Sequence, residues 1–234
     1  KNWFNNIIKN IGIMLNKYFE NNNIQEIGVD EVGRGPMFGR VYTAAVVLPK
    51  NSNCKYELMK DSKKFTSEKK IKEVAQYIKN NALYYSISFE NENIIDKYNI
   101  KEATHMSMHK CIKNISNYEK SLLLIDGINF KPLLYFEDNN LKEVNYKCIE
   151  KGDTKYCAIA AASILAKVER DIYINDLCNN NKFLNDYYDL KNNKGYGTKK
   201  HLEGITKYGI TDMHRKTFGI CKNKEIIDLK IIAY

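Results

Sequence analysis

A short apolar run that ends in two carboxylates constrains this 234-residue chain more than any other feature. Residues 27–29 predict a buried strand, and Asp30 and Glu31 follow at its end. Neighbouring carboxylates repel each other and lose hydration on burial, so they are costly at a strand end unless a cation joins them. Hard cations such as Mg²⁺ prefer oxygen ligands of this kind. The run therefore predicts a strand that ends in a metal site.

A glycine-flanked arginine, Gly33-Arg34-Gly35, follows the carboxylate pair. The glycines permit close approach of a ligand to the backbone, and the guanidinium has the fork geometry that fits a phosphate. The whole run therefore indicates metal-dependent chemistry on a phosphodiester. A solvated acidic turn followed by a glycine loop is the alternative. The coincidence of a strand end, a carboxylate pair and this arginine argues against that alternative.

Two further aspartates stand at predicted element boundaries. Asp126 follows an apolar strand at 122–125, and Asp153 is predicted to begin an alanine-rich helix over 153–176. Sites in open α/β sheets gather where strands end. Four converging carboxylates would bind two divalent ions, which activate a water and stabilise the leaving oxygen of an in-line displacement at phosphorus. For Asp153 alone, an ordinary helix N-cap is an equally good interpretation.

The order of elements predicts the fold class. The predicted strands are residues 27–29, 41–48, 83–89, 122–125 and 144–149. The predicted helices are residues 66–80, 92–98, 101–117, 153–176 and 200–208. A further helix is expected within residues 1–24, and a helix or strand over 223–234. Three hairpin-compatible strands followed by strand–helix alternation predict an α/β fold, with a mixed sheet and helices on both faces.

Composition narrows the partners and the compartment. The net charge of +9 favours a polyanionic partner, although a lysine- and asparagine-rich coding bias explains part of it. The six cysteines form no Cys-x-x-Cys pair, so buried reduced thiols are expected rather than zinc or disulfides. No apolar run approaches the 18 residues of a membrane span. The chain starts at Lys1, which fits a trimmed cytoplasmic protein or the product left after removal of an organelle-targeting segment.

Residues 28–40 resemble the first signature of type 2 ribonuclease H, specifically bacterial ribonuclease HII. The resemblance continues in order along about residues 26 to 219. The further matching segments are Lys60–Lys64 (KDSKK), Asn99–Thr104 (NIKEAT), Leu124–Gly127 (LIDG), Lys151–Asp171, Lys194–His201 (KGYGTKKH) and His214–Phe218 (HRKTF). The order and spacing of these segments make the resemblance specific.

The resemblance implies a ribonuclease H-like mixed five-stranded sheet flanked by helices, with added C-terminal helices. It divides the chain into an N-terminal helical extension (1–25), a catalytic domain (26–219) and a C-terminal extension (220–234). Arg40 stands where the family usually has proline, and the two extensions have no matching counterpart. The N-terminal platform of the related ribonuclease HIII is missing, and Arg34 within Gly-Arg-Gly also favours ribonuclease HII.

The resemblance also implies an activity. It predicts a monomeric endoribonuclease that hydrolyses the RNA strand of RNA–DNA hybrids, including single ribonucleotides in duplex DNA, during ribonucleotide excision in replication and repair. The products carry 3′-hydroxyl and 5′-phosphate ends. Two Mg²⁺ or Mn²⁺ ions would be held by Asp30, Glu31, Asp126 and Asp153. A non-catalytic hybrid-binding module is the main alternative, which the complete carboxylate set argues against. Another metal nuclease or integrase of this fold is disfavoured by the Gly-Arg-Gly and KGYG segments.

Several other residues are candidates for contacts with substrate. Tyr196 lies between two glycines, where its ring can stack on a sugar or base. The resemblance implies that Tyr196 and Gly33-Arg34-Gly35 together sense the 2′-hydroxyl at the RNA–DNA junction. Lys63, Ser163 and Lys167 are candidate phosphate contacts, with a solvated lysine as the alternative for Lys167. Arg170 and Asp171 are expected to pair or cap, and His201 and His214 to be structural or close to substrate.

Overall fold

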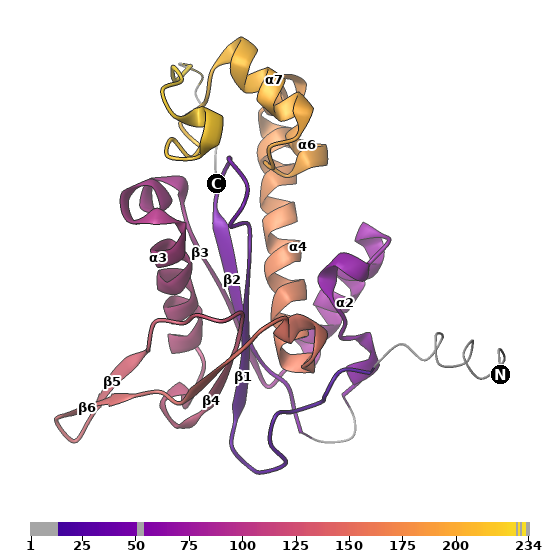
Figure 1. Ribbon diagram of the computed structural model, residues 1–234. Helices are drawn as coiled ribbons and strands as arrows, with labels where there is room; N and C mark the ends of the chain where they lie inside the picture. Colours follow the sequence, from indigo (N-terminus) through magenta and orange to yellow (C-terminus); the bar gives the residue numbers. More distant parts are fainter. Residues whose placement is uncertain (1–13, 51–53, 228, 230, 233–234) are drawn as a thin grey trace, which may run out of the picture.

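A five-stranded mixed sheet forms the centre of the molecule (Figure 1). The computed structural model describes residues 14–50, 54–227, 229 and 231–232. The strands are β1 (Glu26–Val32), β2 (Val41–Val47), β3 (Tyr84–Glu90), β4 (Leu122–Asp126) and β7 (Tyr146–Ile149), in the order β3-β2-β1-β4-β7. The first three pair antiparallel, and β4 and β7 extend the sheet as strands parallel to β1. The predicted mixed sheet is confirmed.

Helices cover both faces of this sheet. They are α2 (Glu68–Asn81), α3 (Glu92–Lys113), α4 (Cys157–Asn180), α5 (Lys182–Tyr188), α6 (Leu190–Asn193) and α7 (Lys199–Tyr208). The long helix α4 packs on β1 and β2, α6 lies beside the C-terminal half of α4, and α7 lies near its C-terminal end (Figure 1). The added C-terminal helices are therefore present as predicted.

Alternate residues of β2 face two separate cores. Ala44 and Val46 pack toward α4 in one core, while Ala45 and Val47 join the core that α3 covers. The alanine-rich face of α4 allows a very close approach to the sheet. A Cβ atom on Gly28 of β1 would lie 2.2 Å from a backbone carbon of α4, so only glycine fits there.

Helix α3 contains a break at Asn99, whose φ of 68° lies in the left-handed region. The Asn99 side chain accepts hydrogen bonds from the backbone amides of Lys101 (2.9 Å) and Glu102 (3.1 Å). It therefore caps a second helical segment, in agreement with the two separate helices predicted at 92–98 and 101–117.

The predicted N-terminal helix is absent from residues 14–24, and residues 1–13 lie outside the described part of the chain. Tertiary contacts hold the described segment in bends. The Glu26 carboxylate accepts from the backbone amides of Phe19 and Glu20 at 2.8 Å, and Asn16 donates to the carbonyl of Lys155. These bonds use amides that a helix would have paired internally, so the apolar spacing alone was misleading.

Two further differences concern irregular regions. The described residues after position 222 form neither the predicted helix nor a strand, apart from a bridge between Ile210 and Ile226. A hairpin of β5 (Leu134–Glu137) and β6 (Asn140–Glu143), which was not predicted, projects from the body (Figure 1). Its turn residues Asp138 and Asn139 both have positive φ, as tight hairpins require.

The state of the cysteines agrees with the prediction made from the sequence. All six cysteines are free, and five of them are buried, as predicted for reduced thiols. Among the described residues, no helix combines the length and apolar character that crossing a bilayer requires.

Candidate active site

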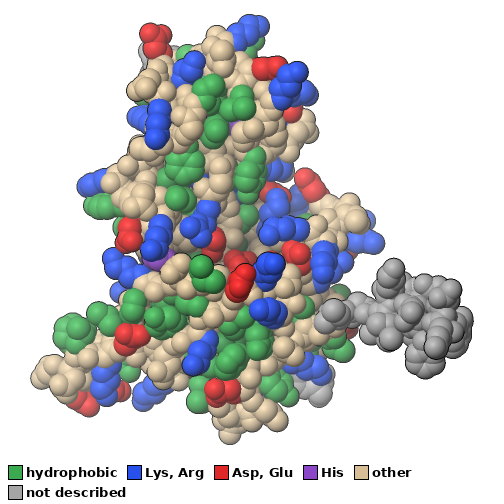
Figure 2. All heavy atoms as spheres, in the orientation of Figure 1, with side chains coloured by type: hydrophobic (Ala, Val, Ile, Leu, Met, Phe, Trp, Pro, Cys, Tyr) green, Lys and Arg blue, Asp and Glu red, His purple; other side chains and the backbone are tan. Residues whose placement is uncertain are grey.

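One pocket brings together the four carboxylates that the sequence singled out. Asp30, Glu31, Asp126 and Asp153 line this pocket, which has a volume of about 370 Å³. They come from β1, from the end of β4 and from a 3-10 turn before α4 (Gly152–Thr154). Acidic side chains lie among lysines and arginines across the middle of the face in Figure 2. The topology thus gathers at one place acids that are far apart in the sequence. We call it the carboxylate pocket.

The carboxylate pocket opens where β4 ends while its neighbour β1 continues. β1 pairs with β4 up to Val29 and Ile125, and β4 ends at the next residue, Asp126. β1 continues beside β2, so Asp30 and Glu31 lie within the strand and not after it as the apolar run suggested. The missing neighbour beyond Val29 leaves room for both side chains at the edge of one cavity.

Asp153 is placed by contacts with Asp126 and not by a helix cap. The backbone amide of Gly152 donates to Oδ1 of Asp126 at 2.6 Å, which ties the 3-10 turn to the end of β4. A Cβ atom on Gly152 would lie 2.5 Å from Cδ1 of Ile159, so a larger residue here would require that side chain to move. Helix α4 begins only at Cys157. The N-cap interpretation and the predicted helix start at Asp153 are therefore wrong.

Burial raises the pKa of three of these carboxylates, Asp30, Glu31 and Asp153. Asp30 is 4% exposed, and burial, followed by the charges of Glu31 and Asp126, raises its pKa well above the usual value. Burial also raises the pKa of Glu31, although the Arg34 guanidinium opposes the shift. The pKa of Asp153 is raised first by burial and then by the charge of Asp126.

The donor set suits a hard divalent cation. Arg34 reaches Glu31 only at 3.4 Å, and its side chain is half exposed, so this ion pair neutralises little. Within the described ranges, no three acidic, histidine or cysteine side chains already stand as a formed metal site. Oxygen ligands that lack a counter-charge are the chemistry that Mg²⁺ and Mn²⁺ prefer.

The two predicted substrate-reading segments touch each other beside this pocket. Tyr196 lines the carboxylate pocket and is 46% exposed. Its ring lies against Gly35, where an added Cβ would be 3.3 Å from Cε1 of the tyrosine. Gly33 has a φ of 91°, and a Cβ there would overlap the Arg170 side chain. Arg34 lines an adjoining pocket together with Glu31.

Known proteins are similar to this chain over most of its length. A family model described as ribonuclease HII matches residues 27–221. A ribonuclease HII of Oceanobacillus iheyensis is 40% identical over 218 residues, which cover 91% of this chain and 76% of that protein. The chain belongs to the ribonuclease HII family. A ribonuclease HII of Clostridioides difficile is 39% identical over 213 residues, which cover 90% of this chain and 76% of that protein.

The fold comparison agrees with this membership of a family of hydrolytic nucleases. The crystal structure of ribonuclease H2 from Pyrococcus horikoshii aligns with a TM-score of 0.65 at 22% identity. The alignment covers 83% of this chain and 94% of that one. The ribonuclease H-like architecture is therefore confirmed.

The three candidate phosphate contacts all line the carboxylate pocket. They are Lys63, Ser163 and Lys167. Ser163 lies 3.1 Å from the hydroxyl of Ser62, another lining residue. The Lys167 ammonium is 2.6 Å from Asp171, so part of its charge is already compensated. A contact with phosphate remains a prediction for all three.

Of the two residues expected to pair or cap, Asp171 pairs with Lys167, whereas Arg170 donates to backbone carbonyl groups. Arg170 is 1% exposed and donates to the carbonyl groups of Phe38 (3.2 Å), Arg40 (3.2 Å) and Lys194 (2.9 Å). It thereby connects the loop before β2 to the segment before Tyr196. Sequence reasoning also missed five other lining residues: Val32, Ser62, Asn192, Asn193 and Lys194. Ser62 and Lys194 lie inside family segments and could have been proposed from them.

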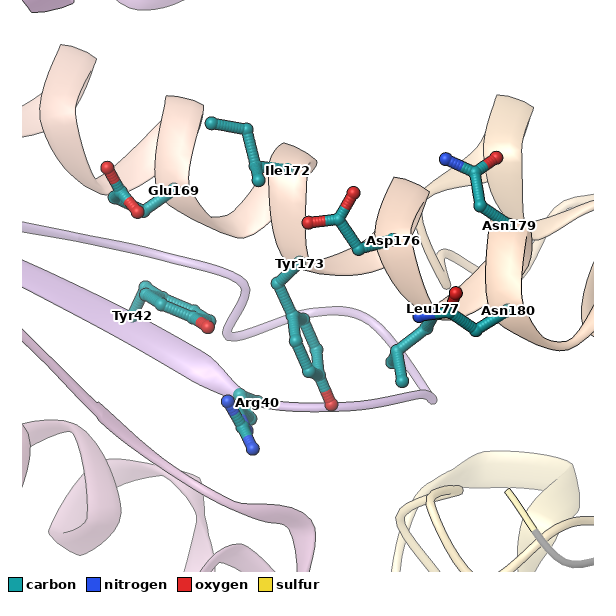
Figure 3. Close-up of a pocket in the computed structure, with 9 residues that line it drawn as sticks. All are labelled: Arg40, Tyr42, Glu169, Ile172, Tyr173, Asp176, Leu177, Asn179 and Asn180. Atoms are coloured by element: carbon teal, nitrogen blue, oxygen red, sulfur yellow. The ribbon is translucent and has the colours of Figure 1, made fainter. Parts of the chain in front are cut away.

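A larger pocket, of about 440 Å³, lies against a different face of α4 (Figure 3). Its lining includes Arg40, Tyr42, Glu169 and Tyr173 but none of the four carboxylates of the candidate site. The Arg40 guanidinium carbon lies 4.0 Å from the ring centre of Phe89 and 4.5 Å from that of Tyr173. Arg40 therefore stacks between two rings where the family usually has proline.

Proposed function

We propose that this member of the ribonuclease HII family hydrolyses the RNA strand of RNA–DNA hybrids and also cleaves at single ribonucleotides in duplex DNA. One observation carries the proposal. Four carboxylates from three chain segments line a single pocket, and an exposed tyrosine packed against Gly-Arg-Gly lies at its edge. The net charge of +9 is consistent with a polyanionic substrate.

Asp30, Glu31, Asp126 and Asp153 are the residues that would hold divalent ions, Mg²⁺ or Mn²⁺. Two such ions, when bound, supply an activated water and stabilise the leaving oxygen, so that the products carry 3′-hydroxyl and 5′-phosphate ends. The protein's contribution is to hold the acids in place. The Gly152 amide fixes Asp126, and the Glu31 amide donates to Asp30 at 2.7 Å. Burial keeps bulk water from competing for these oxygens.

Recognition of RNA requires a group that reads the 2′-hydroxyl. We assign this role to the Tyr196 hydroxyl and to the backbone of Gly33-Arg34-Gly35. The contact between Tyr196 and Gly35 supports a shared role, because one ribose at this edge would meet both. We assign Lys63, Ser163 and Lys167, which line the same pocket, to contacts with the flanking phosphates of that strand.

The test uses a DNA duplex that contains one ribonucleotide, with an all-DNA duplex of the same sequence as control. Each is incubated with the protein in Mg²⁺, in Mn²⁺ and in EDTA. We expect cleavage only at the ribonucleotide, only with metal, and with a 3′-hydroxyl on the upstream fragment. Binding of a hybrid without cleavage in either metal would instead indicate the non-catalytic binding module. Cleavage of the all-DNA duplex would indicate a different nuclease.

A further inference from the structure

Arg215 is a fully buried residue that holds the Gly-Arg-Gly loop from behind. Its guanidinium donates four hydrogen bonds, all of them to backbone carbonyl oxygens between β1 and β2. The acceptors are Gly33 (2.6 Å), Arg34 (3.0 Å), Pro36 (2.7 Å) and Gly39 (2.9 Å). Burial lowers the pKa of Arg215 to about 9. Burying a charge is expensive, so this loop conformation is maintained at a substantial free-energy cost.

A chain of hydrogen bonds runs from Thr211 through His214, the residue before Arg215, and through His201 to Tyr196. The backbone amide of Thr211 donates to Nδ1 of His214 at 3.0 Å, so the proton of a neutral His214 is on Nε2. That Nε2 lies 3.2 Å from Nε2 of His201, which must accept. Nδ1 of His201 therefore carries a proton and donates to the Tyr196 carbonyl at 2.9 Å.

Burial of both histidines favours the neutral rings that this chain of hydrogen bonds requires. Neither side chain is exposed to solvent. Burial lowers the pKa of His201, and burial together with the neighbouring His201 lowers the pKa of His214 well below its usual value. Each neutral ring has one donor and one acceptor, and every one of them is used in the chain from Thr211 to Tyr196.

We propose that His214 and Arg215, acting with His201, are positioning residues that set the two substrate-reading segments against each other. Arg215 fixes the carbonyl groups of the Gly-Arg-Gly loop, and its neighbour fixes Tyr196 through His201. The two segments meet at the contact between Gly35 and the Tyr196 ring. None of these three positioning residues lines the carboxylate pocket, so they act through other residues. This inference rests on the proposed function in one respect, which is the assignment of substrate reading to Gly33-Arg34-Gly35 and Tyr196.

The positioning itself can be tested without substrate or metal. Nuclear Overhauser contacts between the Tyr196 ring and the α-protons of Gly35 report the packing of the two segments in the full chain. We expect His201→Asn to retain the contact, because its amide can replace the Nδ1–H donor. His201→Ala and Arg215→Lys should lose it, because an alanine has no donor and an ammonium cannot reach four carbonyl groups. Unchanged contacts in folded His201→Ala protein would overturn the proposal, even if Arg215→Lys does not fold.

The consequence for recognition is measured as an affinity ratio in EDTA. The ratio compares a duplex containing one ribonucleotide with the matching all-DNA duplex. His201→Ala should lower this ratio roughly fivefold, and no further in a Tyr196→Ala background, while His201→Asn stays within about twofold of wild type. Additive losses in the double variant, or equal losses on both duplexes, would overturn the proposal. A wild-type ratio of one would contradict the proposed reading of the 2′-hydroxyl, and the Gly35 contact would still decide the positioning role.

Discussion

The carboxylate pocket and the arginine cluster behind it bury charge in opposite ways. Asp30, Glu31 and Asp153 have raised pKa values because burial and mutual repulsion disfavour their ionised forms. Arg170 and Arg215 are buried at least as completely, yet their guanidinium groups donate to seven backbone carbonyl groups in total, three and four respectively. The acids have little compensating charge, since the half-exposed Arg34 reaches Glu31 only at 3.4 Å, whereas the arginines donate to carbonyl groups of the chain itself.

This difference assigns ligand binding to the acidic side of the site and the maintenance of loop conformation to the arginine side. A buried charge without a partner is stabilised by a ligand of opposite charge, so the acidic side of the site is prepared for cations. The buried guanidinium groups donate three and four of their five N–H groups to backbone carbonyl groups, so their main role is to fix the loops that carry those carbonyls. Changes on the acidic side should therefore affect chemistry, and changes on the arginine side should affect stability and recognition.

The largest expected effect is on the acidic side. Asp126→Asn keeps the shape of the side chain but loses cation affinity, so single-turnover cleavage should fall by about a thousandfold or more while hybrid binding persists. Asp138→Asn, in the exposed turn of the β5–β6 hairpin, is the matched control and should cleave normally. Cleavage by Asp126→Asn at the rate of the control would remove this carboxylate from the mechanism.

On the arginine side, the next largest effect is on folding. Arg215→Met keeps an unbranched apolar stem but leaves four carbonyl groups without their donor. We expect a loss of about 3 kcal/mol in the free energy of unfolding, measured by urea denaturation. Lys216→Met, at the exposed neighbouring position, should change it by less than about 0.5 kcal/mol. Equal stability of the two variants would show that Arg215 does not hold the loop.

Tyr196 lines the carboxylate pocket, and its proposed role is to read the 2′-hydroxyl at the cleavage site. Tyr196→Phe removes one hydrogen-bonding group, so cleavage at a single embedded ribonucleotide should fall roughly tenfold. Tyr196→Ala should fall further because stacking is also lost, whereas longer hybrids should suffer less because they offer more 2′-hydroxyl contacts. Tyr98→Phe, an exposed tyrosine on α3, serves as the control. If Tyr196→Ala cleaves the single ribonucleotide normally, only Gly33-Arg34-Gly35 remains as the reader.

The smallest expected effect is a gain in stability on the acidic side. The pKa of Asp30 is raised in the folded state from its ordinary 3.8, so folding favours its protonated form. In EDTA, the free energy of unfolding therefore decreases as the pH rises from 3.8 through the folded-state pKa of Asp30. The decrease is complete above that pKa. Asp30→Asn removes this decrease and should raise the melting temperature in EDTA at pH 7 by a few degrees. Added Mg²⁺ should narrow the gap by stabilising the wild type. A lower melting temperature for Asp30→Asn in EDTA would mean that the charge is already neutralised internally.

The sequence predicted the features that depend on local pattern. The mixed sheet and the helices on both faces follow from apolar periodicity, and Asp126 ends its strand as predicted, whereas Asp30 and Glu31 lie within β1. The hairpin at β5 and β6 was missed although Asp138-Asn139 is a turn signal, because its strands are short and polar and resemble a loop.

Features that depend on distant contacts could not be predicted in this way. The setting of Asp153 depends on a hydrogen bond between Gly152 and Asp126, and the segment before β1 is bent by Glu26. The partners of Arg215 lie about 180 residues away along the chain, as the sequence separations of 176 and 182 show. Periodicity contains no information about such contacts, so His214 and Arg215 appeared in the sequence only as part of a family segment.

The central claim is that the carboxylate pocket is a site for divalent cations. The most direct measurement is anomalous diffraction from crystals of the full chain grown with Mn²⁺. We expect manganese peaks coordinated by Asp30, Glu31, Asp126 and Asp153, and loss of at least one peak in Asp126→Asn crystals. Crystals that bind Mn²⁺ elsewhere, or that leave this pocket without metal at millimolar Mn²⁺, would contradict the account.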